Sequence, residues 1–323
     1  MRRHDVFRSV PLVSAVAVAT LFGAAPVVAT AAAPVPPDQM PTLSDIGAAA
    51  DHTADAESSR YEMYITVSGG PFGDGAGASD TPFAVGVVRG TDTSIEMDLT
   101  GLFEGMPGAG ALVGDMDLSM DMIGIGTDLY LHAPFYELLA MGGDSVPPEV
   151  QVLVDGWGYI DTERVPGLSI ADLQSQTGTP GASPSSYLSS LGKGTELTSV
   201  GVVSIGGVES VGVAMNITLG EMMEAQAPAG EVTLDAEAAG QPVPLEVWIG
   251  SDGYIRRMVI TMDSTVLAAT AEGQNTPTSV LDDASMVLRF DSFDFDDPTI
   301  EVAAPKDFTD VTDFFADAML VGS

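Results

Sequence analysis

The pattern that most constrains the fold is a strand–turn–strand sequence at residues 245–262, LEVWIGSDGYIRRMVITM. Apolar residues alternate with polar or aromatic ones in both halves, and a period of two places successive side chains on opposite faces of a strand. Between the halves, Asp252 and Gly253 supply turn chemistry, because Gly tolerates positive φ and Asp hydrogen-bonds its own backbone. The alternation recurs along most of the chain, so we predict a large antiparallel sheet with one apolar face.

The stretch 115–122, DMDLSMDM, shows the alternation in its strictest form. No amphipathic helix produces a period of two over eight residues. We expect the apolar set to face a core or a cavity and the aspartates to face solvent, because a slip of one residue would bury the carboxylates. The apolar set is Met116, Leu118, Met120 and Met122, and the aspartates are Asp115, Asp117 and Asp121.

Weaker patterns predict the remaining elements. Further strands are expected at 61–67, 83–89, 94–99, 127–132, 156–160, 196–205, 207–219 and 285–293. Helices are expected at 44–58, with Ser44 as the N-cap, at 219–226 and at 309–320. The stretch 165–191 is expected to be helical and loop-like, and 69–80 and 270–278 are expected to be loops.

The first 29 residues are organised like a signal peptide. Arg2, Arg3 and Arg8 precede an apolar run at 10–25, and small residues follow it. We expect export and cleavage after Ala29, with cleavage after Ala31 or Ala33 as alternatives. An uncleaved membrane anchor is the alternative to cleavage, since the run is barely long enough to span a bilayer. The predicted organisation is then a signal peptide at 1–29, a spacer rich in Pro and Ala at 30–42, a folded domain at 43–305, and an acidic C-terminal segment with a docking helix at 306–323.

Charge and composition exclude several functional classes. The chain has 11 Lys and Arg against 46 Asp and Glu, a formal net charge of −35 at pH 7. Such a surface repels phosphate backbones, so we expect no nucleic-acid partner. There is no cysteine, which excludes disulfides, thiolate metal sites, cysteine nucleophiles and a lipid anchor on cysteine.

The sequence offers little that indicates catalysis, and we do not expect an enzyme. It contains no serine-hydrolase elbow, zinc-protease motif, P-loop or dinucleotide fingerprint. A hydrolase that uses His52 or His132 in a triad stays open as the least favoured alternative. The aspartates at 291, 294, 296 and 297 lack the spacing of a calcium loop, so neither a metal nor a cofactor is expected.

The functional hypothesis rests on the methionine residues. Sixteen occur, many of them on the inferred apolar face, and this flexible, polarizable side chain can line a surface that adapts to varied apolar ligands. Two interpretations stay open: a cavity that holds a ligand, or a core filled by the protein's own helices. The cavity-lining candidates are Met63, Ile65, Met97, Met116, Leu118, Met120, Met122, Met215, Ile217, Val247, Ile249, Met258, Ile260, Met286 and Leu288.

Short motifs follow one another in an order that points to a known family. They are SRYEM at 59–63, DLYLHAP at 128–134, GWGYID at 156–161, VGVVSIGGV at 200–208, the hairpin at 244–260, VLRF at 287–290 and IEVAAP at 300–305. In this order the chain resembles the actinobacterial LppX/LprAFG lipoprotein family over most of residues 43–313. The resemblance implies a LolA-like fold: a curved antiparallel sheet that forms a half-barrel, with helices over its concave face around an apolar cavity.

The resemblance also implies a function and shows two departures. Members are implied to bind or carry acylated lipids and lipoglycans in the cell envelope, yet this chain lacks the lipidated cysteine and has polar insertions near 69–82 and 263–284. We therefore expect an α+β protein that is a secreted, monomeric carrier of an acylated lipid or lipoglycan, with a partner protein in the envelope or membrane. The alternative is a non-enzymatic extracellular interaction or structural protein with a fully packed sheet.

Overall fold

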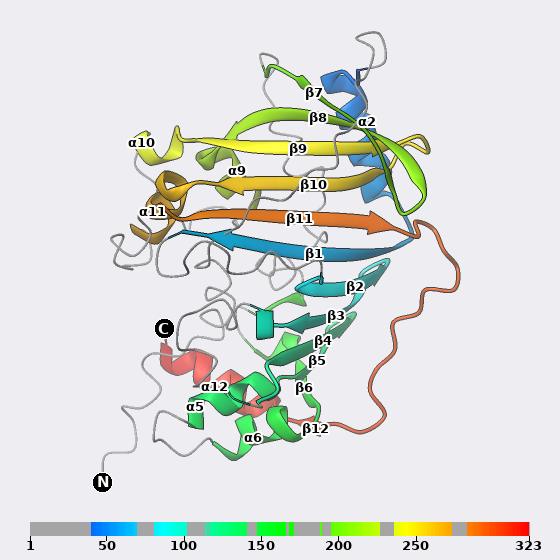
Figure 1. The fold of residues 1–323 in the computed structure, drawn as a ribbon. Helices are drawn as coiled ribbons and strands as arrows, with labels where there is room; N and C mark the ends of the chain where they lie inside the picture. Colours follow the sequence, from blue (N-terminus) through cyan, green and yellow to red (C-terminus); the bar gives the residue numbers. More distant parts are fainter. Residues whose placement is uncertain are drawn as a thin grey trace.

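The computed structural model describes residues 40–69, 81–101, 114, 116–140, 147–165, 168–170, 188, 195–226, 236–272 and 283–322. Twelve strands form one open sheet in the order β12-β6-β5-β4-β3-β2-β1-β11-β10-β9-β8-β7 (Figure 1). Neighbouring strands are antiparallel except β12 and β6, which are parallel. The α+β class with a large antiparallel sheet is thus confirmed. The strands are β1 (Ser58–Ser68), β2 (Ala84–Arg89), β3 (Asp92–Asp98), β4 (Ser119–Ile125), β5 (Asp128–His132), β6 (Gly158–Asp161), β7 (Thr198–Ile205), β8 (Val208–Thr218), β9 (Pro242–Gly250), β10 (Ile255–Met262), β11 (Ser285–Phe293) and β12 (Thr309–Asp310).

Helices lie at both ends of the long strands and beside the short ones. The helix α2 lies at one end of β8–β10, α9, α10 and α11 lie at the other, and α5, α6 and α12 lie near β4–β6 (Figure 1). The helices are α2 (Leu43–Ala54), α5 (Glu137–Ala140), α6 (Pro148–Asp155), α9 (Leu219–Gln226), α10 (Ala236–Ala239), α11 (Ser264–Glu272) and α12 (Thr312–Gly322), with 3-10 turns η4 (Pro134–Tyr136) and η5 (Thr162–Arg164).

The first helix begins earlier than the sequence analysis predicted. Thr42, and not Ser44, is the N-cap of α2: its hydroxyl accepts from the Asp45 amide while the Asp45 carboxylate accepts from the Thr42 amide. This reciprocal capping box satisfies two backbone donors that the first helical turn leaves unpaired. The helix also ends at Ala54, with Asp55 as the C-cap, because strand β1 already begins at Ser58.

Tight turns connect the hairpins and set their registers. The turn between β7 and β8 consists of Gly206 and Gly207, both with positive φ (+57° and +82°). Positive φ at both central positions gives a turn whose twist matches that of the flanking strands. In the β9–β10 hairpin, Gly253 has φ +86°, as the Ser-Asp-Gly signal predicted.

Two further predictions about the ends of elements were wrong. The stretch 270–278 was expected to be a loop, but α11 extends to Glu272 and buries Val266 and Leu267. The last helix begins at Thr312, and not at 309, because Thr309 and Asp310 form β12 beside β6. The signal peptide, the loop at 70–80 and most of 171–191 lie outside the described residues.

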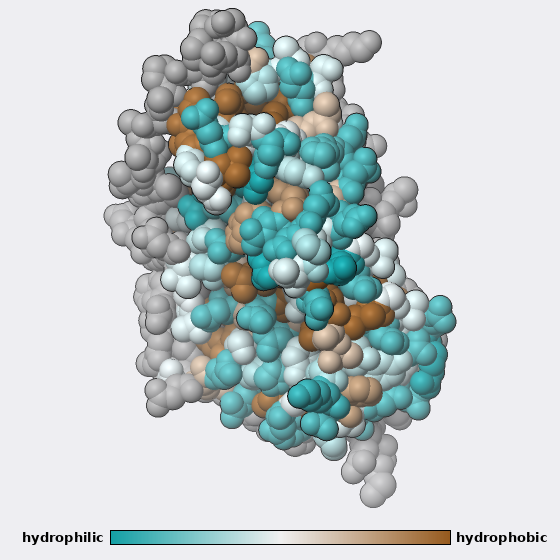
Figure 2. Space-filling model, turned by 90° about the vertical axis from the view of Figure 1, so that its right-hand side faces the viewer, coloured by the Kyte–Doolittle hydropathy of each residue, from teal (hydrophilic) through white to brown (hydrophobic). Residues whose placement is uncertain are grey.

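The segment 294–308 connects β11 to β12 and passes along the side of the sheet (orange in Figure 1). Figure 2 shows this side of the molecule, where hydrophilic residues predominate and apolar ones gather in separate patches. Within the described residues, Phe308 is the large apolar side chain that is exposed, at 48%. Its ring packs against Tyr130 and Tyr159, with centroids 5.2 and 5.5 Å away. Scattered apolar surface of this kind is ordinary for a globular protein.

Candidate functional site

One face of the sheet is apolar from β8 to β6. We define this inner face by Tyr61, Met63, Ile65 and Val67 of β1 and by their register partners across the sheet. Residues directly opposite on neighbouring strands share a face, so the register identifies its rows. One row consists of Met120, Met97, Ala84, Met63, Phe290, Met258, Val247 and Val213. The next row consists of Ile65, Leu288, Ile260, Leu245 and Met215.

The candidates that lie in strands all fall on this inner face. Most candidates are buried: Met63, Ile65, Met97, Leu118, Met122, Met215, Ile217, Val247, Met258, Ile260 and Met286. The half-buried ones are Met116, Met120, Ile249 and Leu288. The period-two alternation therefore brings these side chains together on one surface; that they line a ligand cavity stays a prediction.

The strict alternation at 115–122 forms a strand only from Ser119 onward. Met120 and Met122 lie on the inner face, opposite Met97 and Ile95, while Asp121 lies on the other face. Before the strand, Leu118 is buried, Met116 is half-buried and Asp117 is exposed. Asp115 lies outside the described residues.

Helices pack against the inner face at the two ends of β8–β10. The helices α2 and α11 contact β10, α2 also contacts β9, and α9 contacts β8. Their buried residues belong to the same hydrophobic cluster as the inner face. These residues are Ile46, Ala49 and Ala50 of α2, Leu219 and Met222 of α9, and Val266 and Leu267 of α11. Leu288, in the middle of the sheet, nevertheless keeps exposed surface although its neighbours Ile65 and Ile260 are buried.

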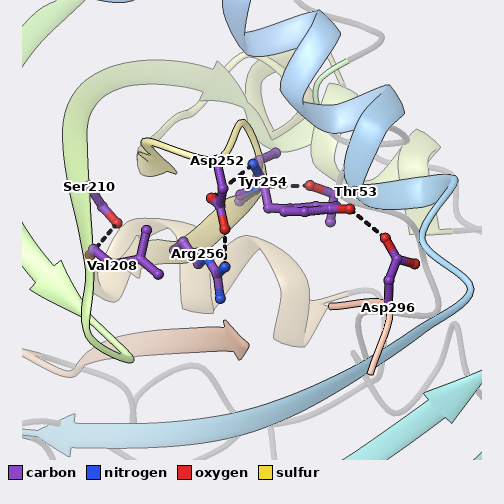
Figure 3. Close-up of polar contacts among 8 residues, drawn as sticks. Thr53, Val208, Ser210, Asp252, Tyr254, Arg256 and Asp296 are labelled. Carbon is purple, nitrogen blue, oxygen red and sulfur yellow. Dashed lines mark hydrogen bonds and ion pairs between the residues drawn. The ribbon is translucent and has the colours of Figure 1, made fainter. Parts of the chain in front are cut away.

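The C-terminal end of α2 is attached to the β9–β10 turn (Figure 3). The Thr53 hydroxyl accepts from the Ile255 amide (2.8 Å), and the His52 ring stacks on Tyr254 with centroids 4.1 Å apart. The Tyr254 hydroxyl donates to Asp296 (2.6 Å). This bond raises the pKa of Tyr254 to about 12 and lowers the pKa of Asp296, because it favours the neutral phenol and the ionised carboxylate. We call these four contacting side chains and Ile255 the α2 clamp.

The opposite face of the sheet, the outer face, carries the charges. Arg257 donates to both carboxylate oxygens of Asp291 (2.5 and 2.6 Å), and Asp291 is only 10% exposed. The Arg289 guanidinium lies 3.6 Å from the centroid of the Tyr64 ring, and the Tyr64 hydroxyl donates to Glu62 (2.6 Å). Burial raises the pKa of Tyr64 to about 12. In contrast, no inner-face position of the described strands is Lys, Arg or His.

The inner face also contains a polar ring that the sequence analysis did not single out. Tyr61 pairs with Gly86, and a Cβ at Gly86 would lie only 2.3 Å from Tyr61 Cζ, so the ring lies directly over the glycine. The Tyr61 side chain is 1% exposed, and its hydroxyl has no partner in hydrogen-bond geometry. The available signal was the period of two, which places Tyr61 in line with Met63.

The histidines and aspartates that the sequence analysis considered for catalysis or metal binding have other partners in the structure. His132 Nδ1 lies 3.2 Å from Asp121 on the outer face, and His52 belongs to the α2 clamp. Asp294 pairs with Arg60 (3.2 Å), and Asp297 accepts from the Thr299 amide (2.8 Å). Among the described residues, no three acidic or histidine side chains are grouped as a metal site would require. None of the described helices combines the length and apolarity needed to cross a membrane.

Comparisons with known proteins found similarity in solved structures. A search of protein-family models and a search of curated sequences found no match. The structure of the lipoprotein LppX from Mycobacterium tuberculosis is similar at 16% identity, with 81% of this chain and 97% of that one covered and a TM-score of 0.41. The structure of LprF from Mycobacterium bovis is similar at 12% identity, with 81% and 96% covered and a TM-score of 0.39. The solved structures to which this chain is similar thus include two proteins named in the family that its sequence motifs resemble.

Proposed function

We propose that this protein is a carrier outside the cytoplasm that binds the acyl chains of a lipid or lipoglycan against its inner face. The observation that supports this proposal is the predominantly apolar surface that continues across the described strands, which is rich in methionine and contains no basic side chain. We further propose that it acts as a secreted monomer in the cell envelope, with a membrane or envelope protein as its partner.

The energetics of an acyl chain explain why such a face is needed. A chain of about 16 carbons loses roughly 0.8 kcal/mol per CH₂ on entering water, on the order of 12 kcal/mol in total. A carrier must offset most of this with dry, apolar contacts. Methionine side chains suit the task, because their flexible thioethers repack around chains of different shape.

Binding of a lipid requires that some of the helices packed on the inner face move, because most of that face is buried. The helices over β8–β10 are short and contact the sheet through few large side chains, namely Ile46, Leu219, Met222, Val266 and Leu267. Leu288 marks the place where the inner face keeps exposed surface in mid-sheet. We propose that acyl chains enter near Leu288 and displace the helices from the methionine rows.

A second candidate is a non-enzymatic interaction protein whose sheet is filled by its own helices. The burial of most candidate residues favours it, since a face packed to near-zero exposure has no need of a ligand. The two candidates differ in one measurable respect, which is whether the protein from its native organism carries lipid.

Native mass spectrometry of that protein, before and after organic extraction, tests the proposal. We expect an extractable mass increment of one or more acyl lipids. In the variants Met120→Gln and Met215→Gln the loaded fraction should fall several-fold, because a polar amide in the acyl path is desolvated without a partner. Asn216→Gln is the matched control, since Asn216 is exposed beside Met215. Circular dichroism and melting must first show that each variant is folded; wild-type protein that never carries lipid would establish the packed interaction protein instead.

A further inference from the structure

The Tyr61 hydroxyl is an unused hydrogen-bond donor within the inner face. Buried polar side-chain atoms nearly always have a partner, so one that lacks it in an apolar setting calls for an explanation. Burial raises the pKa of Tyr61, and interaction with the Thr93 hydroxyl opposes part of that rise, so the phenol stays protonated at any physiological pH. Thr93 itself donates to the Val87 carbonyl (3.3 Å). Tyr61 is therefore a permanent neutral donor.

The Tyr61 hydroxyl lies beside the two rows of inner-face side chains that contain the methionines. Tyr61 is two residues from Met63 in β1, so the two side chains are neighbours on the inner face. The Tyr61 ring can lie flat against the sheet only because Gly86 has no side chain. An acyl chain that follows the row through Met63 and Met258 would thus pass beside the phenol.

The charges of the two faces restrict what the donor can bind. No inner-face position of the described strands carries a basic side chain, whereas Arg257 and Arg289 both point to the outer face and share Asp291. A carboxylate on the inner face would therefore be desolvated without a counter-charge, which is costly. An ester carbonyl needs only a neutral donor.

We propose that the Tyr61 hydroxyl donates a hydrogen bond to the ester carbonyl of a neutral acyl ester, and that the inner face thereby prefers acyl esters to fatty-acid anions. This inference rests on the proposed carrier function. It adds a specificity-determining residue and a class of polar group that the ligand must carry.

Three probes of equal chain length test it: monoolein, which is an acyl ester, oleate at pH 8, and 1-octadecene, each supplied from cyclodextrin. Wild-type protein should bind monoolein at least tenfold more tightly than oleate. Tyr61→Phe should weaken monoolein binding by about threefold to tenfold, because this change in affinity corresponds to the loss of one hydrogen bond. The same variant should leave octadecene binding unchanged. Tyr64→Phe is the matched control, because Tyr64 lies on the outer face of the same strand, and it should change neither affinity.

The infrared carbonyl stretch of bound monoolein gives a readout that folding alone does not move. It should lie at lower wavenumber in wild-type protein than in Tyr61→Phe. If neither monoolein nor octadecene binds, the carrier function is wrong. If both bind but Tyr61→Phe weakens neither, if oleate binds as tightly as monoolein, or if the wild-type carbonyl is free of hydrogen bonding, the carrier function stands and the role of Tyr61 is overturned.

Discussion

The two faces of the same strands are stabilised in different ways. On the inner face, methionine and aliphatic side chains meet in rows and gain stability from burial of apolar area. On the outer face, partly buried ion pairs such as Arg257–Asp291 lie beside rings and glycines: a Cβ at Gly212 would lie 2.6 Å from the Trp248 ring. The inner face can exchange one apolar contact for another at little cost, whereas the outer face depends on specific partners. The difference suggests that the inner face adapts and the outer face keeps the sheet in register.

The largest expected effect comes from placing a charge on each face in turn. Met215→Asp should lower the free energy of unfolding by about 3–5 kcal/mol, because the new carboxylate is buried without a partner. Asn216→Asp, at the exposed neighbouring position, should change it by less than about 0.5 kcal/mol. Urea unfolding followed by circular dichroism measures both. Equal losses in the two variants would show that the faces do not differ as described.

An intermediate effect is expected when an outer-face partner is removed. Asp291→Ala should cost about 2 kcal/mol, because Arg257, with 24% of its side chain exposed, loses both hydrogen bonds and Arg289 loses the same counter-charge. Arg60→Ala breaks an ion pair whose side chains are 43% and 49% exposed, and should cost less than about 1 kcal/mol. The same urea experiment compares them. A cost for Asp291→Ala no larger than that for Arg60→Ala would mean that the outer face gains no extra stability from this partly buried ion pair.

The smallest expected effect concerns the α2 clamp at the edge of the inner face. The pKa of Asp296 is lowered from 3.8 in the folded protein, so its stabilising contribution is present above pH 3.8 and is lost as the pH falls through the lowered value. Asp296→Asn should lower the melting temperature by about 1 °C at pH 7, since this carboxylate is exposed. Melting curves of both proteins should converge as the pH falls through the lowered Asp296 pKa; a difference that persists there would assign the loss to something other than the charge.

The local sequence pattern was sufficient to predict the elements whose two faces differ most in polarity. The strands β1, β8, β9, β10 and β11 alternate strictly enough to be predicted close to their bounds, and α9 was predicted at 219–226, where it lies. The helix α11 was missed because the apolar residues of its sequence, STVLAATAE, are mostly alanine and do not mark out one face of the helix. The short strand β12 was missed because its partner β6 lies about half the chain away and only two residues pair.

The candidate site likewise has features that the sequence predicts and features that it does not. The period of two assigns its side chains, Tyr61 among them, to one face. It does not reveal that the Tyr61 ring lies over a glycine of the next strand or that its hydroxyl lacks a partner. The sequence of residues 58–68 does not reveal that Tyr61 lies opposite Gly86. The α2 clamp was likewise beyond prediction, since it joins Thr53, Tyr254 and Asp296 from three distant segments.

By itself the sequence determined which side chains share a face, because alternation along a strand is a property of the backbone at each residue. It also determined the acidic surface and the absence of cysteine chemistry. Only the tertiary structure decided the order of the strands, in which β1 inserts between β2 and β11 and joins the two halves of the sheet. The physical reason is that backbone hydrogen bonds are the same for every residue, so the choice of partner strand depends on packing and turns across the whole chain.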